Sequence, residues 1–315
     1  MIQSIRITNP KNESIKMELK NPWENGIAIY KIDGLGPAKA NVNLTDLATG
    51  DGAIFSNARV TPRNIVIHIK PLDVEVHAHN EPAKLEKIIE EVRQGLYRYF
   101  PLKKQVKFEV VTTNRRVETY GIVESIDTDI FSKQSTLQIS LLCPDPFFRS
   151  PQIEEYAFLG ALPIFEFPFS NESLTENLLE FGILRDDSRA NLYYEGEVDT
   201  GVLIRFQPRR TIDTGEIILF NVDTLETMTI NASKLTDIMG DPFTHGDVIE
   251  VSTIRGNRYC RLLRRGQYTN VLSAFNRDMT WFQLTPGDNV FDFTVEPDLL
   301  ALVVRFHYTN AFAGI

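Results

Sequence analysis

The sequence predicts a mainly β protein with two domains, an N-terminal α+β domain and a C-terminal β-sandwich. Three observations lead to this fold class. Short runs in which apolar and polar residues alternate recur along the 315 residues, as they do in half-buried strands. One segment between Pro82 and Pro101 has apolar residues at helical spacing instead. The prolines from Pro144 to Pro151 then separate a first part, which has both strand and helix patterns, from a second part with strand patterns alone.

The N-terminal domain is expected to span residues 1–143 and to form an antiparallel sheet with one helix against it. Alternating apolar residues on both sides of the turn at 9–12 predict a first hairpin. Further strands are expected at 27–32, 65–69, 106–110, 119–126 and 137–141. The helix carries its apolar face on Leu85, Ile88, Ile89, Val92 and Leu96.

Residues 144–151 form a proline-rich hinge. Proline lacks a backbone N–H, so this segment is neither a helix nor a central strand. Phe147 and Phe148 lie in its middle, where a flexible linker would carry Gly and Ser. We therefore expect a stiff interdomain joint in which Phe147 and Phe148 pack between the two domains.

The C-terminal domain is expected to span residues 152–315. Its apolar runs are short and are separated by Gly, Asn, Asp and Pro, which is typical of a β-sandwich. Strands are expected at 164–169, 191–198, 201–206, 216–220, 227–230, 248–254, 259–263, 280–284, 290–295 and 299–307. Almost no helix is expected in this half.

Composition argues against several classes of partner. The net charge is −9, whereas proteins that bind nucleic acid are usually basic because they neutralise phosphates. Nucleic-acid binding is therefore not expected. No apolar run approaches the length that crosses a membrane, so membrane insertion is not expected either. The cysteines Cys143 and Cys260 fall on opposite sides of the domain break and are expected to be small buried hydrophobic residues.

No catalytic or cofactor-binding motif is predicted. The segment Gly34–Ala40 lacks both the Gly-Lys-Ser/Thr ending of a phosphate loop and the third glycine of a dinucleotide fingerprint. His68, His77 and His79 could hold zinc, but no Cys or paired acidic motif joins them at ligand spacing, so solvated loop histidines are the favoured alternative. We expect no enzyme, no cofactor and no metal.

Tyr193, Tyr194 and Trp281 give the second domain a candidate surface for stacking on sugar rings. Core packing explains the same aromatic residues and is favoured, because aromatic side chains dominate cores. A carbohydrate-binding adhesin acting through the C-terminal sandwich therefore stands as the alternative to a structural protein.

Short motifs spread along the chain resemble those of one protein family. They are Asp33-Gly34-Leu35-Gly36-Pro37-x-Lys39-Ala40, Gly50-Asp51-Gly52, Ser56-x-x-Arg59, Arg63-Asn64-Ile65-Val66-Ile67, Cys143-Pro144-Asp145-Pro146-Phe147-Phe148, Leu284-Thr285-Pro286-Gly287-Asp288-Asn289 and Tyr308-x-x-x-Phe312-Ala313-Gly314-Ile315. In combination they are similar to the distal tail protein (Dit) family of siphophages, the phages with long non-contractile tails. The resemblance spans nearly the whole chain.

The resemblance implies a structural virion protein of the phage tail tip, or baseplate. In that family the first domain forms a six-fold ring that joins the tail tube to the baseplate, and the second is a galectin-like β-sandwich. The implied partners are further copies of the chain in a homo-hexamer, the tail tube protein, a tail-associated hub or lysin protein, and receptor-binding or upper baseplate proteins. The implied location is the virion, after assembly in the host cytoplasm.

A ring requires that one patch of the chain meets a different patch on its neighbour. The segment 40–62 is punctuated by glycine, and its apolar residues are too scattered for a core strand. We expect a subunit interface that includes Val42, Leu44, Leu47, Ile54 and Phe55.

Overall fold

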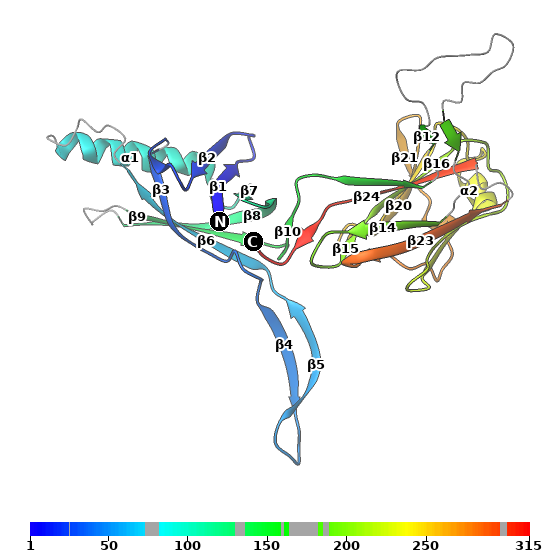
Figure 1. Ribbon diagram of the computed structural model, residues 1–315, viewed down its shortest axis with the longest axis horizontal. Helices are drawn as coiled ribbons and strands as arrows, with labels where there is room; N and C mark the ends of the chain where they lie inside the picture. Colours follow the sequence, from blue (N-terminus) through cyan, green and yellow to red (C-terminus); the bar gives the residue numbers. More distant parts are fainter. Residues whose placement is uncertain are drawn as a thin grey trace, which may run out of the picture. The chain divides into compact units, whose positions relative to one another are not determined.

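The computed structural model describes residues 1–24, 26–72, 82–129, 136–158, 161–163, 182–184, 189–296 and 301–315. The chain divides into two compact units (Figure 1). Unit 1 consists of Met1–Pro151 and Ala311–Ile315, and unit 2 consists of Gln152–Asn310. The expected second domain, 152–315, therefore extended too far at its C-terminal end. The physical reason is that Ala311 and Phe312 pair with Arg149 and Phe148 of unit 1.

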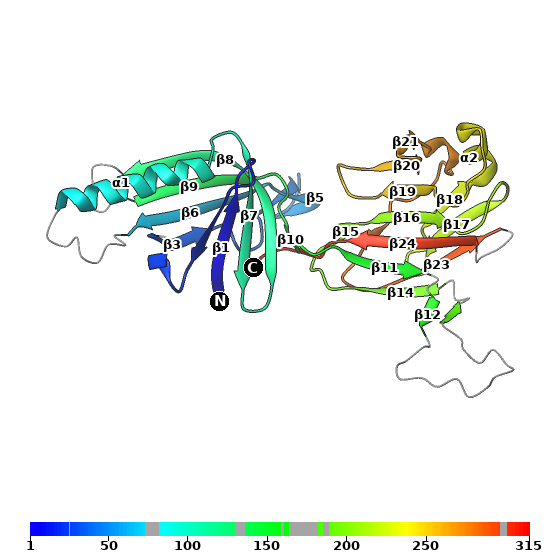
Figure 2. The same ribbon diagram turned by 90° about the horizontal axis from the view of Figure 1, so that it is seen from above.

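Unit 1 is built on one antiparallel sheet with the strand order β2-β1-β7-β8-β9-β6-β3 (Figure 2). Its strands are β1 (Ile2–Thr8), β2 (Ser14–Glu18), β3 (Ile27–Asp33), β6 (Arg63–Pro71), β7 (Gln105–Thr112), β8 (Arg116–Asp129) and β9 (Thr136–Cys143), and a short 3-10 helix lies at Pro22–Glu24. Two short strands, β10 (Phe148–Arg149) and β25 (Ala311–Phe312), pair with each other, and β10 also pairs with β8.

Alternation along these strands buries one face of the sheet. Ile65, Ile67 and Ile69 of β6 are all completely buried, as the alternating pattern requires. The predicted first hairpin is confirmed, because β1 pairs antiparallel with β2 and places Ile5 opposite Met17.

The predicted helix is α1 (Pro82–Tyr99). It begins at a proline, whose missing N–H has no partner to lose in a first helical turn. Val92 and Leu96 pack against the core of the sheet, and the helix lies along the sheet in Figures 1 and 2. The side chains of Leu85, Ile88 and Ile89 lie outside the described residues.

Unit 2 contains two main antiparallel sheets, with the orders β11-β24-β16-β19-β20-β21 and β14-β23-β17-β18. Their strands are β11 (Glu154–Phe158), β14 (Arg189–Tyr194), β16 (Leu203–Pro208), β17 (Glu216–Asn221), β18 (Thr227–Asn231), β19 (Val248–Ser252), β20 (Tyr259–Arg264), β21 (Gln267–Asn270), β23 (Gly287–Val295) and β24 (Leu302–Tyr308). Two further pairs are β12 (Ala161–Pro163) with β13 (Gly182–Leu184) and β15 (Thr200–Gly201) with β22 (Gln283–Leu284).

Both main sheets contribute to one hydrophobic core. Phe291 of the four-stranded sheet and Phe306 of the six-stranded sheet have ring centroids 4.8 Å apart. Two antiparallel sheets around a shared core form the β-sandwich that the sequence predicted. The galectin-like character of this sandwich stays a prediction.

One helix of unit 2 was not predicted, α2 (Ala232–Met239). The side chain of Asn231 accepts a hydrogen bond from the backbone N–H of Lys234, and Gly240 ends the helix with a left-handed φ of 77°. An Asn at the start and a Gly at the end form a sequence signal that would have predicted this helix.

Two expected strands of unit 2 differ from the structure or lie outside it. The expected strand at 164–169 lies outside the described residues. The expected strand at 280–284 is present only as β22 (Gln283–Leu284).

Cys143 in unit 1 and Cys260 in unit 2 are both buried free thiols. Burial raises the pKa of Cys143 to about 11 and that of Cys260 to about 12. Both residues therefore act as neutral packing groups, and the prediction of small buried hydrophobic residues is confirmed.

Candidate functional site

The strands β4 (Ala40–Asp46) and β5 (Ala53–Val60) form a hairpin that, within the described part of the chain, pairs with no other strand. It belongs to unit 1, emerges between β3 and β6, and stands clear of their sheet in Figure 1. Every residue of both strands is exposed. At its base, the backbone N–H of Thr61 donates to the carbonyl oxygen of Lys39 at 2.9 Å.

The two faces of this hairpin differ in chemistry. On one face, Asn43 donates to Asn57 at 2.5 Å, and the hydroxyls of Thr45 and Ser56 lie 2.9 Å apart. The cross-strand register places the apolar residues on the opposite face, namely Ala40, Val42, Leu44, Phe55, Ala58 and Val60. The hairpin is thus an amphipathic two-stranded ribbon, and we call it the ribbon.

A β-bulge keeps the apolar face of the ribbon continuous. Asn43 pairs with Asn57 but Leu44 pairs with Phe55, so Ser56 is an extra residue in β5. Without this extra residue the alternation would turn Phe55 to the polar face. The apolar face therefore depends on one inserted residue.

The five predicted interface residues all lie in the ribbon, but not on one face. Val42, Leu44 and Phe55 share the apolar face and are 50%, 60% and 60% exposed. Ile54 pairs with Thr45 and lies on the polar face, while Leu47 follows the end of β4. Whether they form an interface stays a prediction.

A two-stranded hairpin in water is only marginally stable by itself. Exposed apolar surface of this kind also marks sites of interaction. The ribbon is therefore the candidate functional site of unit 1, a surface that is stabilised when another surface covers its apolar face.

Arg63, the first residue of β6, anchors the base of the ribbon. Arg63 is only 3% exposed, and its guanidinium carbon lies 4.3 Å from the centroid of the Phe148 ring. The guanidinium donates hydrogen bonds to four backbone carbonyl oxygens, those of Gly34 (2.5 Å), Gly36 (2.5 Å), Pro146 (2.8 Å) and Ala313 (2.6 Å). Four motifs of the family resemblance, distant in sequence, thus meet at one side chain.

Two glycines allow these segments to approach. Gly34 has a left-handed φ of 87°, and a Cβ there would lie 2.0 Å from the carbonyl oxygen of Asn64. A Cβ on Gly314 would lie 3.1 Å from a backbone atom of Gly36. The close backbone packing explains why glycine suits these positions.

The two hinge phenylalanines occupy different environments. Phe148 is fully buried in the core of unit 1, where it pairs with Phe312. Phe147 is half-buried, and its N–H donates to the side chain of Asp145 at 3.1 Å. The burial of Phe148 is explained within unit 1, and packing of either ring between the domains stays a prediction.

The structure separates the aromatic residues proposed for sugar stacking. Tyr194 is 1% exposed and its hydroxyl donates to the carbonyl oxygen of Val198, so its assignment as a stacking residue is wrong. The reason is alternation along β14, which turns Tyr194 into the core and leaves Tyr193 63% exposed. Trp281 is half-buried against the same core, with the guanidinium of Arg258 5.6 Å from its ring centroid.

The histidines offer little for a metal site. His68 lies on β6, and its Nε2 is 3.2 Å from a carboxylate oxygen of Asp33. His77 and His79 lie outside the described residues. Among the residues that are described, no three His, Cys, Asp or Glu side chains are placed to hold a metal ion.

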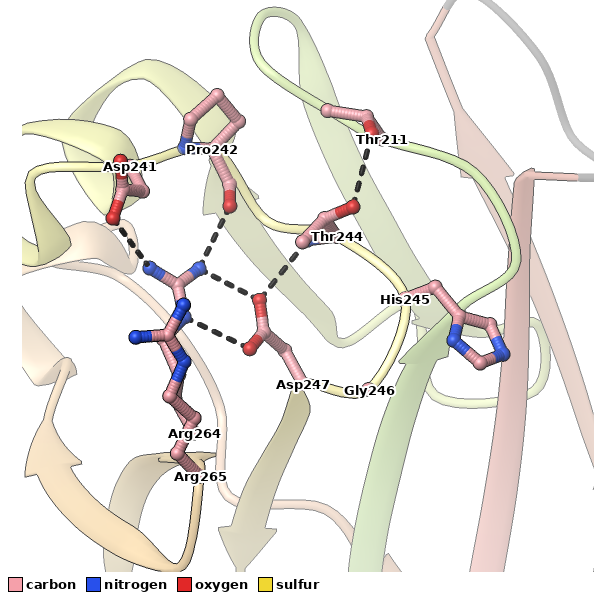
Figure 3. Close-up of a pocket in the computed structure, with 9 residues that line it drawn as sticks. All are labelled: Thr211, Asp241, Pro242, Thr244, His245, Gly246, Asp247, Arg264 and Arg265. Atoms are coloured by element: carbon pink, nitrogen blue, oxygen red, sulfur yellow. Dashed lines mark hydrogen bonds and ion pairs between the residues drawn. The ribbon is translucent and has the colours of Figure 1, made fainter.

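A surface pocket of unit 2 is lined by an ion pair between Arg264 and Asp247 (Figure 3). Arg264 donates to both carboxylate oxygens of Asp247, at 2.8 and 2.6 Å, and to the carbonyl oxygen of Pro242. Burial alone would raise the pKa of Asp247, but hydrogen bonds from Arg264 and from the Thr244 N–H hold it below its usual value. These groups satisfy one another, so the pair holds the loop at Pro242–Asp247 in place.

The fold and the ribbon together define a two-unit, mainly β protein with a protruding surface suited to association. Among solved structures, the chain is similar to the SPP1 Dit (gp 19.1) protein, described as a paradigm of the hub adsorption apparatus in phages that infect Gram-positive bacteria. The identity is 10%, the match covers 97% of this chain and 98% of that one, and the TM-score is 0.61. The chain therefore has a mainly β, Dit-like fold, as the family resemblance led us to expect.

Two structures of the phage P2 baseplate in its activated conformation, with Ca and with Sr, match at 10% identity over 98% of both chains, with a TM-score of 0.46. No protein-family model matches the sequence, and no curated protein matches it. In the described part of the chain, no helix is both long and apolar enough to cross a membrane.

Proposed function

We propose that this chain is a structural virion protein of a phage tail tip, whose unit 1 assembles into a hexameric ring between tail tube and baseplate. The observation that carries the proposal is the ribbon, with an apolar face that is exposed in the single chain. The fold shared with the SPP1 Dit protein supports it. The role is one of assembly and not of catalysis.

The chemistry of the ribbon fits a ring of identical copies. In a ring, each copy presents one patch to a different patch on the next copy. The ribbon is such a patch, because its apolar face has no complementary surface on the hairpin itself. Covering Val42, Leu44 and Phe55 with a neighbour would remove apolar area from water and stabilise both the ribbon and the ring.

The further partners follow from the same proposal. The ring of unit 1 would contact the tail tube protein and a tail-associated hub or lysin protein. Unit 2, as a galectin-like sandwich, would contact receptor-binding or upper baseplate proteins. The protein would then be located in the virion, after assembly in the host cytoplasm.

The experiment compares two substitutions on opposite faces of the ribbon. Phe55→Asp places a charge on the apolar face, and Thr45→Asp places the same charge on the polar face. Mass in solution, measured by light scattering, and electron micrographs report whether particles of six times the 35.9 kDa chain mass form.

We expect rings for the unchanged protein and for Thr45→Asp, and single chains for Phe55→Asp. Both residues are exposed, so the melting temperature of unit 1 should be nearly the same in both variants. Rings that persist in Phe55→Asp would show that the ribbon is not the interface. Single chains for the unchanged protein, alone and with a tail tube protein, would reject the proposed function.

A further inference from the structure

The outer face of the six-stranded sheet in unit 2 carries a row of arginines. Alternation places Arg305 of β24, Arg205 of β16 and Arg261 of β20 on the side of the sheet that faces away from the core. The register aligns them across neighbouring strands, with Glu250 of β19 between Arg205 and Arg261. Strands lie about 4.8 Å apart, so the row is about 14 Å long.

One buried carboxylate holds two of these arginines in place. Glu250 is 3% exposed; Arg205 donates to one of its oxygens at 3.0 Å and Arg261 to the other at 2.7 Å. Arg261 also lies between two aromatic rings, 4.3 Å from the centroid of Tyr259 and 3.8 Å from that of Tyr268. Two guanidinium groups are thus pre-positioned, while 38% and 35% of their side chains remain exposed.

The third arginine creates an unfavourable pair. Arg305 is directly opposite Arg205, and like charges in this position destabilise a sheet. Its carboxylate partner, Glu155, is 45% exposed, so water screens much of that attraction. Burial, and after it the positive charge of Arg205, lower the pKa of His307, which faces outward beside this pair. The three arginines of this face thus outnumber its two carboxylates, Glu250 and Glu155, in a protein whose net charge is −9.

An apolar row runs beside the arginines on the same face. It consists of Val303, Val248, Leu263 and the ring of Tyr268, with Gln207 between the valines. Tyr268 is 52% exposed. Guanidinium groups only donate hydrogen bonds, and both oxygens of Glu250 are occupied, so Arg205, Glu250 and Arg261 together offer donors to a ligand and favour one rich in acceptors.

We infer that this sheet face is a docking surface for an acidic segment of a partner protein, with carboxylates on Arg205 and Arg305 and apolar side chains beside Tyr268. Charge complementarity and the adjacent apolar row favour a protein segment. Arginine and tyrosine are also the residue types enriched at the centres of protein interfaces. The inference concerns unit 2 alone and holds whether or not unit 1 forms a ring.

The test uses the full chain and a fluorescein-labelled peptide in which Glu and Leu alternate, with fluorescence anisotropy as the readout. Arg305→Gln and Tyr268→Ala alter the face but leave both hydrogen-bonded partners of Glu250 in place. Arg189→Gln is the matched control, because Arg189 is 60% exposed on the other sheet. Polyphosphate and polygalacturonate serve as competing anions that are not proteins.

We expect the peptide to bind, and binding to weaken about tenfold in Arg305→Gln and in Tyr268→Ala but not in Arg189→Gln. Added salt should weaken it because the charged groups are partly exposed. A peptide with Gln in place of Glu should not bind. The inference is overturned if the Glu-Leu peptide does not bind, or if Arg189→Gln weakens binding as much as the other two substitutions. It is also overturned if polyphosphate and polygalacturonate compete as well as unlabelled peptide does.

Discussion

The guanidinium of Arg63 donates a hydrogen bond to the carbonyl oxygen of Ala313 at 2.6 Å and so joins residues 250 positions apart in the chain. This contact lies inside unit 1, although all of unit 2 separates the two residues in sequence. Unit 1 is therefore complete only when Ala311–Ile315 have returned to it. The same side chain fixes the loop from which the ribbon emerges, so closure of unit 1 and placement of the ribbon are coupled.

Replacing Arg63 with Met should destabilise unit 1 by about 3 kcal/mol, because four part-buried hydrogen bonds from a charged donor to backbone carbonyl oxygens would be lost. Urea unfolding followed by hydrogen exchange in β6 and β10 measures this loss. The control is Arg59→Met, an exposed arginine of the ribbon, which should change stability by less than about 0.5 kcal/mol. Equal effects of the two substitutions would contradict the role of Arg63.

Replacing Gly34 with Ala should destabilise unit 1 by at least about 2 kcal/mol. The new Cβ would overlap the carbonyl oxygen of Asn64, and φ at this residue is left-handed. Gly36→Ala is a close control in the same loop, since a Cβ there meets nothing within 4 Å. Thermal unfolding of both variants measures this, and we expect a lower melting temperature for Gly34→Ala but not for Gly36→Ala.

Phe312→Ala should destabilise unit 1 and leave unit 2 unchanged, although Phe312 follows unit 2 in the sequence. Its ring packs in the core of unit 1 and lies 4.4 Å from the guanidinium carbon of Arg115, so we expect a loss of about 3 kcal/mol. Hydrogen exchange should rise in β8 and β10 and stay constant in β23. Ile315→Ala, at a 36% exposed position of the same segment, is the control. Faster exchange in β23 would contradict the assignment of Phe312 to unit 1.

The Asp247–Arg264 pair should make the stability of unit 2 depend on pH. The folded-state pKa of Asp247 lies below its ordinary value, so the stabilisation is present above that value and is lost as the pH falls through the folded pKa. Urea unfolding of unit 2 at pH 7 and at about pH 3 measures the difference. Asp247→Asn should lower stability at pH 7 and reduce the dependence on pH, and an unchanged dependence would contradict the prediction.

Local patterns in the sequence were sufficient for much of the fold. Alternation predicted β6 and the first hairpin, helical spacing predicted α1, and the proline-rich segment marked the end of the first unit's main span. These features are set by side-chain periodicity and by the missing N–H of proline, which act within a few residues. The segment 40–62 was also singled out from sequence, because its apolar residues did not fit a core strand.

The tertiary structure decided what such patterns cannot contain. The bulge at Ser56 selects which side chains of the ribbon share a face, and the pairing of Phe148 with Phe312 returns the end of the chain to unit 1. Tyr193 and Tyr194 are identical in type, and the register of β14 on its neighbour determines which of them is buried. Arg63 acquires its role only when distant backbone segments supply its acceptors. The sequence by itself thus determines which residues prefer burial. Long-range strand register and loop closure determine which segments those residues contact. The reason is that such contacts join parts of the chain that are distant in sequence, and no local pattern in one part indicates the other.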